Sequence, residues 1–185
     1  DALVFVGLPW EWKGKLYNVA AAICHGRLLG LVPKKNLPNY SEFYEMRHFE
    51  PANEELDYIE YPGEEEQEWI PFGMQQIFYC PQMEGLTVAA EICEDLWVPQ
   101  PPSITHAIAG ANVIVNLSAS DEITGKDSYR RNLVGGQSAR LVCGYIYADA
   151  GEGESSTDLV FAAHNLIAEN GTILAPVSYT HLRAH

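Results

Sequence analysis

The sequence predicts a single mixed α/β domain in which a β-sheet is layered with helices. Three observations support this prediction. The chain has 185 residues, 47% of them hydrophobic, which suffices for one sizeable core and is too few for two comfortable domains. Short apolar runs recur along the chain, as buried strands do. Two segments with a helical pattern separate such runs in the second half of the chain.

Strands dominate the first half of the prediction. Apolar runs indicate strands at residues 3–7, 16–24, 28–32, 76–80 and 86–92. A His-Gly-Arg turn joins the second and third of these into a hairpin. A proline-bracketed loop follows at 33–40, and a short amphipathic segment at 42–49. The acid-rich stretch 50–68 is expected to be a solvated surface arm.

Helices and strands alternate in the second half. We expect a helix at 103–109, capped by Ser103, and a longer one at 127–142. The expected strands are 113–117, 144–148, 159–163, 165–169 and 172–175, with an Asn-Gly turn before the last.

The two ends of the chain are expected to differ from the rest. The chain begins inside a strand, so we expect a piece of the sheet to precede residue 1. Residues 177–185 depart from the earlier patterning and are interpreted as a non-native tail. The expected domain therefore covers residues 1–176.

Composition argues against several classes of function. The net charge is −14, and an acidic chain repels phosphate backbones and anionic lipid, so neither nucleic acid nor a membrane is an expected partner. No apolar stretch approaches a membrane span, and no signal peptide pattern is present. The four cysteines lack CxxC spacing and the histidines form no ligand-spaced pair. We therefore predict reduced thiols in a cytoplasmic protein and no metal site.

Cys93 is the first candidate for chemistry. Cys93 directly follows the apolar run 86–92. Glu94 and Asp95 come next, and a proline-rich segment after them ends the strand pattern. A thiol at a strand end is lifted towards a pocket, where backbone N–H groups can meet an oxyanion. The alternative is a small apolar core residue followed by two solvated acids.

Three further patterns carry possible chemistry. Lys34, in the proline-bracketed loop, could stand beside a developing oxyanion, or could simply be solvated. The run Asn116–Ser120 could hold the polar end of a small ligand, or could be a strand cap. The stretch 151–158 combines glycines with acids and lacks the lysine of a phosphate-binding loop, so ATP is not expected to bind there.

Four ordered stretches resemble the carbon-nitrogen hydrolase (nitrilase) superfamily, and within it the glutaminase domains of glutamine-dependent NAD synthetases. The stretches are residues 30–40 with 42–45, residues 91–99, residues 109–111 with 116–120, and residues 150–161. The resemblance runs from about residue 3 to residue 174 and implies a nitrilase-like αββα sandwich, here truncated at its N-terminus.

The resemblance also implies roles for individual residues. Cys93 would be the nucleophile, Lys34 the catalytic lysine and Glu45 an auxiliary acid. The implied substrate-binding residues are Tyr40, Glu94, Trp97, Ser120 and Lys126. Some members have arginine where Lys126 stands, so a bidentate grip on the substrate carboxylate would become a single-point contact. The third catalytic residue of the family, a general-base glutamate, is expected before residue 1, so the fragment alone is expected to be inactive.

The implied activity is hydrolysis of the side-chain amide of L-glutamine through a cysteine thioester. The ammonia would feed a synthetase domain, absent from these residues, that makes NAD(+) from deamido-NAD(+) with ATP and magnesium. No cofactor is expected in this domain, and a homo-oligomer is expected. Two alternatives remain open: another carbon-nitrogen hydrolase (an amidase, nitrilase or carbamoylase), or a catalytically silent interaction fragment.

Overall fold

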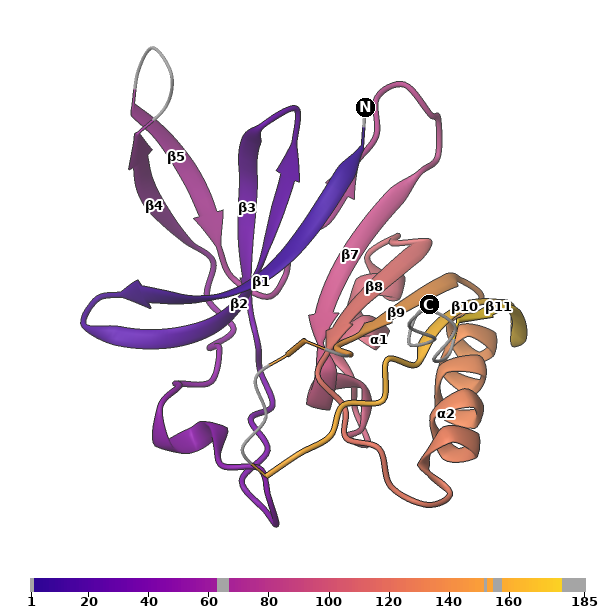
Figure 1. The fold of residues 1–185 in the computed structure, drawn as a ribbon. Helices are drawn as coiled ribbons and strands as arrows, with labels where there is room; N and C mark the ends of the chain where they lie inside the picture. Colours follow the sequence, from indigo (N-terminus) through magenta and orange to yellow (C-terminus); the bar gives the residue numbers. More distant parts are fainter. Residues whose placement is uncertain (1, 63–66, 152, 155–157, 178–185) are drawn as a thin grey trace.

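The computed structural model describes residues 2–62, 67–151, 153–154 and 158–177 and contains two β-sheets. One has five strands in the order β1-β2-β3-β5-β4, and the other has six in the order β11-β10-β9-β8-β7-β6 (Figure 1). The strands are β1 (Leu3–Trp12), β2 (Lys15–Cys24), β3 (Arg27–Pro33), β4 (Asp57–Pro62), β5 (Gln67–Phe72), β6 (Phe78–Tyr79), β7 (Thr87–Ile92), β8 (Val113–Ser118), β9 (Gly144–Asp149), β10 (Asn165–Glu169) and β11 (Thr172–Val177). The helices of the described residues are α1 (Pro102–Ile108), α2 (Lys126–Leu141) and two short 3₁₀ helices, η1 (Glu45–Arg47) and η2 (Cys93–Leu96).

The five-stranded sheet contains a hairpin that the sequence prediction missed. The stretch 50–68 was expected to be a solvated arm, but it supplies β4 and the start of β5, which pair antiparallel with Ile59 opposite Ile70. Both isoleucines are buried, as is Phe72. Apolar residues at alternate positions give the hairpin one buried face in spite of its charge. The acids between them concealed this alternation.

The six-stranded sheet is mixed. Strands β7, β8 and β9 run parallel, and β6, β10 and β11 pair antiparallel with their neighbours. Helices α1 and α2 connect the parallel strands and cover the sheet on the side away from the five-stranded sheet (Figure 1). Buried Ile114, Tyr145, Leu166 and Val134 form the core beneath them. The predicted Asn-Gly turn joins β10 to β11, with positive φ at both residues.

Several predicted boundaries change in the structure. Strand β1 continues to Trp12, and β6 is reduced to two residues. Residues 159–163 were wrongly predicted to form a strand: they contribute only an isolated bridge from Phe161 to Asp121. Ser103 does not cap α1, because Pro101 occupies the cap position and the Ser103 N–H donates to Glu91 at 2.8 Å. The expected helix 127–142 is confirmed within one residue.

Alanine and β-branched side chains form the contact between the two sheets. Ala20, Val32, Ala90 and Ile92 are buried between them, where β2 contacts β7 and β1 contacts β8. This arrangement brings the carboxyl end of β7, which leads into Cys93, against the five-stranded sheet.

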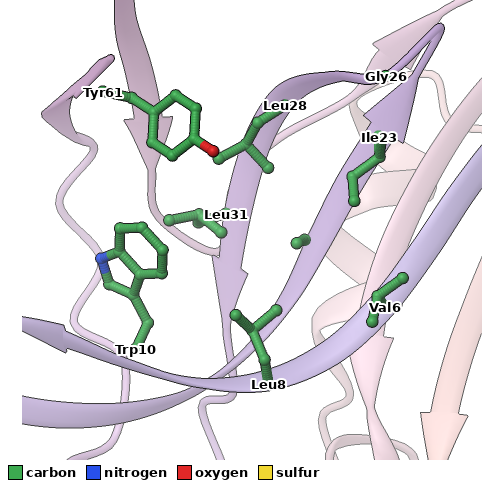
Figure 2. Close-up of a pocket in the computed structure, with 9 residues that line it drawn as sticks. Val6, Leu8, Trp10, Ile23, Gly26, Leu28, Leu31 and Tyr61 are labelled. Carbon is green, nitrogen blue, oxygen red and sulfur yellow. The ribbon is translucent and has the colours of Figure 1, made fainter. Parts of the chain in front are cut away.

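The opposite face of the five-stranded sheet carries an apolar pocket of about 290 Å³. Figure 2 shows Val6, Leu8, Trp10, Leu28 and Tyr61 around it. Its lining offers no thiol, amine or carboxyl group, so it is not a site for the chemistry suggested by the sequence.

The remaining expectations concern membrane-spanning helices, the cysteines, metal sites and the C-terminal residues. Neither α-helix of the described residues is long and apolar enough to cross a membrane. The four cysteines are free thiols. No group of three or more His, Cys, Asp or Glu within the described ranges is placed to hold a metal ion. Of the expected tail, Val177 belongs to β11, and 178–185 lie outside the described residues.

Candidate active site

A pocket of about 410 Å³ opens between the sheets where β7, β8 and β9 end. The carboxyl ends of parallel strands meet at one edge of a sheet, which is where α/β folds commonly bind ligands. Cys93, Lys34 and Glu45 all line this pocket. Three residues chosen from separate parts of the sequence are thus brought together in space.

Cys93 sits at a sharp turn from strand to helix. Strand β7 ends at Ile92, and η2 begins at Cys93, whose φ is +45°. A non-glycine residue in this left-handed conformation costs on the order of 1–3 kcal/mol, so the surroundings must hold it. A comparable turn exposes the nucleophile of α/β-hydrolases. Half-buried Cys93 lines the pocket and also packs against the core between the sheets.

Asp95 ties this turn to the loop that carries Lys34. Its carboxylate is buried and accepts hydrogen bonds from the Ile92 N–H (3.0 Å), the Asn36 N–H (2.8 Å) and the Asn36 side chain (2.9 Å). Burial raises the pKa of Asp95, and these hydrogen bonds oppose the rise. Sequence reasoning missed this role, because an acid beside a turn gives no local sign that it will be buried.

The Lys34 ammonium is fixed and almost fully buried. Its side chain is 1% exposed, and Nζ lies 2.7 and 2.9 Å from the two carboxylate oxygens of Glu45. Its backbone N–H donates to the Asn18 carbonyl on β2 at 2.8 Å. A buried cation of this kind needs a paired anion, and Glu45 on η1 provides it.

A second group surrounds Glu94, directly after Cys93. The Tyr40 hydroxyl lies 3.1 Å from both carboxylate oxygens of Glu94. The Lys126 ammonium lies 5.1 Å from the centre of the Trp97 ring and pairs with Asp121. Desolvation raises the pKa of Glu94, and the Tyr40 hydrogen bond and the charges of Lys34 and Lys126 oppose that rise. Four of the five expected substrate-binding residues therefore cluster beside the turn.

Ser120, the fifth of these residues, is placed differently. It is 2% exposed, and like the other four it is not among the residues that line the pocket. Its hydroxyl accepts from buried Arg130 (3.0 Å), and its N–H donates to Asp149 (2.8 Å). Ser120 thus joins Arg130 to a pocket carboxylate. Sequence reasoning did not single out Arg130.

Two carboxyl groups near the turn have raised pKa values: Glu91, which is buried, and Asp149, which is half-buried. Desolvation raises the pKa of Glu91 to about 7, against the hydrogen bond from Tyr145. Desolvation also raises the pKa of Asp149 to about 6, against the Ser120 N–H and the charge of Arg130. Asp149 and Glu154 line the pocket with Glu45, so its lining is acidic and disfavours phosphates. Of the stretch 151–158, residues 152 and 155–157 lie outside the described residues.

The geometry suits one kind of chemistry. The thiol can attack a carbonyl carbon. The fixed ammonium in the same pocket can then stabilise the negative charge that develops on the carbonyl oxygen.

Comparison with known proteins identifies relatives of this chain. No family model matches the chain. It is 42% identical over 173 residues, 94% of its length, to the glutamine-dependent NAD(+) synthetase of Mycobacterium tuberculosis, and covers 25% of that protein. The chain thus spans about a quarter of the length of the curated relatives it matches.

Solved structures agree with the sequence comparison. A glutamine-dependent NAD(+) synthetase from Cytophaga hutchinsonii superposes with a TM-score of 0.81 at 28% identity, over 95% of this chain and 27% of that one. A mutant amidase from the nitrilase superfamily of Nesterenkonia has a TM-score of 0.67 at 16% identity, over 93% of this chain and 55% of that one. This second likeness shows the fold alone: a nitrilase-like α/β fold, partial relative to the full domains.

Proposed function

This chain belongs to the nitrilase-superfamily glutaminase region of the glutamine-dependent NAD(+) synthetase family, and we propose that it hydrolyses the side-chain amide of L-glutamine to glutamate and ammonia. The observation that carries the proposal is the shared pocket: the Cys93 thiol at a strained strand end opens onto the same cavity as the buried Lys34–Glu45 pair.

The proposed reaction has two steps. The Cys93 sulfur attacks the amide carbon, and Lys34 together with the backbone N–H after Cys93 stabilises the oxyanion. Collapse breaks the carbon–nitrogen bond, ammonia leaves with the proton it needs, and a glutamyl thioester remains. Water then adds to the thioester, and glutamate and the thiol are released. The base that accepts the thiol proton and activates the water is proposed to be a glutamate outside these 185 residues.

The polar cluster around Glu94 would hold the amino acid end of the substrate. Glu94, with Tyr40 beside it, suits the ammonium group of glutamine. Lys126, packed on Trp97, would give its carboxylate a single-point contact. Ser120 would not touch the substrate: it would help to position Asp149 at the pocket, through its hydrogen bonds to Asp149 and Arg130.

The proposal extends to the whole protein of which this region is a part. Ammonia would pass to a synthetase domain that converts deamido-NAD(+) to NAD(+) with ATP and magnesium, in a cytoplasmic homo-oligomer. This region itself would need no cofactor.

The test uses the complete protein that contains this chain. Ammonia release from glutamine should be lost in Cys93→Ala and retained in Cys24→Ala, a control at a cysteine outside the pocket lining. A glutamine-like diazoketone should label Cys93 and not Cys24. Equal turnover by Cys93→Ala would refute the proposal.

The same assay separates the alternatives. Faster turnover of nitriles or carbamoyl amino acids than of glutamine would favour another carbon-nitrogen hydrolase. Absence of labelling in both the complete protein and the 185-residue chain would indicate a silent interaction fragment.

A further inference from the structure

Three buried polar side chains form a line behind the Cys93 turn. Glu91, Asn116 and Tyr145 stand on the neighbouring parallel strands β7, β8 and β9, and none is more than 1% exposed. They are absent from the pocket lining, and their polar groups are hydrogen-bonded within the protein.

Hydrogen bonds connect this line to the nucleophile. The backbone N–H of Cys93 donates to Asn116 Oδ1 at 3.1 Å, and Asn116 Nδ2 lies 3.1 Å from the Tyr145 hydroxyl oxygen. The Tyr145 hydroxyl donates to Glu91 Oε1. The other oxygen of Glu91 accepts the Ser103 N–H at 2.8 Å.

The direction of these bonds determines the orientation of the amide. A phenol has one proton. Above about pH 7, where Glu91 is ionised and can only accept, Tyr145 gives this proton to Glu91, so the Tyr145 oxygen can only accept from Asn116. Asn116 must therefore turn its NH₂ group towards Tyr145, which leaves its carbonyl oxygen for the N–H of Cys93. The opposite orientation would set an NH₂ group against that N–H.

We propose that Asn116 is a positioning residue for Cys93, and that Tyr145 and Glu91 set the orientation of its amide. The bond to Asn116 holds the backbone of Cys93 in the left-handed conformation that aims the thiol into the pocket. Without it, relaxation of φ moves the thiol away from its present position at the pocket. The inference rests on the proposed nucleophilic role of Cys93 only for its effect on turnover.

The first test follows the backbone, independently of activity, in the complete protein. Hydrogen exchange read by mass spectrometry should be about tenfold or more faster for the peptide spanning 92–96 in Asn116→Leu than in the wild type, while peptides from β8 and β9 stay unchanged. Gln76→Leu is the matched control: it also removes a buried amide, and the Gln76 side chain donates to the Leu31 and Gly73 carbonyls instead of joining the hydrogen-bonded line.

The second test uses the direction of the bonds. Tyr145→Phe removes the hydroxyl that orients the Asn116 amide, but it does not force that amide to invert. In Glu91→Gln the oxygen of the new amide faces the Ser103 N–H, so its NH₂ group faces Tyr145. Tyr145 must then give its proton to Asn116, which inverts the Asn116 amide. Exchange at 92–96 should therefore increase more in Glu91→Gln than in Tyr145→Phe, an order that a merely space-filling role would not produce.

Turnover provides a third measurement. In Asn116→Leu, kcat for ammonia release should fall about tenfold to a hundredfold with KM little changed, because the thiol is misplaced and the substrate contacts are intact.

The outcomes are separable. Unchanged exchange at 92–96 in Asn116→Leu would overturn the inference, whatever the activity. Faster exchange in a protein whose wild type neither releases ammonia nor reacts with the diazoketone would support the positioning role and refute the proposed function. Should Asn116→Leu fail to fold, the order of Glu91→Gln and Tyr145→Phe decides the matter.

Discussion

At the scale of single residues, the pocket depends on a few buried charges with assigned partners. Lys34 is held by Glu45, and Asp95 by three N–H donors. Removing one partner of such a pair leaves the other uncompensated, which costs more than the pair itself contributes. Variants at this scale must therefore separate effects on chemistry from effects on folding.

Lys34→Ala should reduce turnover strongly. Loss of one oxyanion donor typically costs about 2.7–4 kcal/mol, on the order of a hundredfold to a thousandfold in kcat. Cys93 should still react with iodoacetamide, because the thiol remains at the pocket. Lys35→Ala removes a neighbouring, partly exposed lysine paired to Glu54 and should leave kcat unchanged. Full ammonia release by Lys34→Ala would exclude a catalytic role for this lysine.

Lys126→Arg should improve substrate binding. A guanidinium can hold a carboxylate through two parallel hydrogen bonds, where the ammonium offers a single-point contact. We expect KM for glutamine to fall several-fold with little change in kcat, measured by steady-state ammonia release. A change in kcat alone would mean that Lys126 does not contact the substrate carboxylate.

At the scale of elements, local patterns identified most strands and the long helix, and failed where charge masks alternation. The β4–β5 hairpin escaped prediction because a run of acids resembles a solvated loop, although Ile59, Ile70 and Phe72 give the hairpin a buried face. Ser103 resembles a helix cap, but Pro101 takes that place because Glu91, which is distant in sequence, binds the Ser103 N–H. The turn between β10 and β11 was predictable because Asn-Gly has a strong local preference.

Gly171→Ala should destabilise the packing of this turn on α2. Gly171 has φ +87°, and a Cβ atom there would lie 2.9 Å from the Cβ of Ala139. We expect a loss of about 1–3 kcal/mol in the free energy of unfolding, measured with urea. Gly136→Ala, inside α2 with open space around it, should instead stabilise by about 0.4–1 kcal/mol. Equal effects of the two substitutions would contradict the predicted strain.

At the scale of the whole molecule, packing of the two sheets and the helices buries carboxyl groups that are in water in the unfolded chain. The pKa of Glu91 rises from 4.5 to about 7 on burial, so the folded state binds more protons than the unfolded state between these values. Stability from this group is therefore present at low pH and lost as pH rises through about 7. Burial lowers the pKa values of His106 and His164, so these two residues make the free energy of unfolding rise with pH, opposite to the effect of Glu91.

Comparison with Glu91→Gln isolates this contribution, because the histidines are common to both proteins. Between pH 5 and pH 8 the wild type should lose up to about 3 kcal/mol of unfolding free energy relative to Glu91→Gln. Urea titrations of both proteins at several pH values would measure the difference. A difference that is constant with pH would mean that Glu91 titrates normally in the folded state.

The sequence by itself determined the local features: the strand that ends in Cys93, the lysine in its proline-bracketed loop, and the order of motifs that identifies the superfamily. These features depend on neighbours a few residues apart, which periodicity and turn preferences encode. Only the tertiary structure decided that Asp95 and Asn116 accept hydrogen bonds from the Ile92 and Cys93 N–H groups, and that Ser120 binds Arg130 beneath the pocket surface. Those partnerships join strands and loops distant in the chain, and they follow from sheet order and register, which no local pattern specifies.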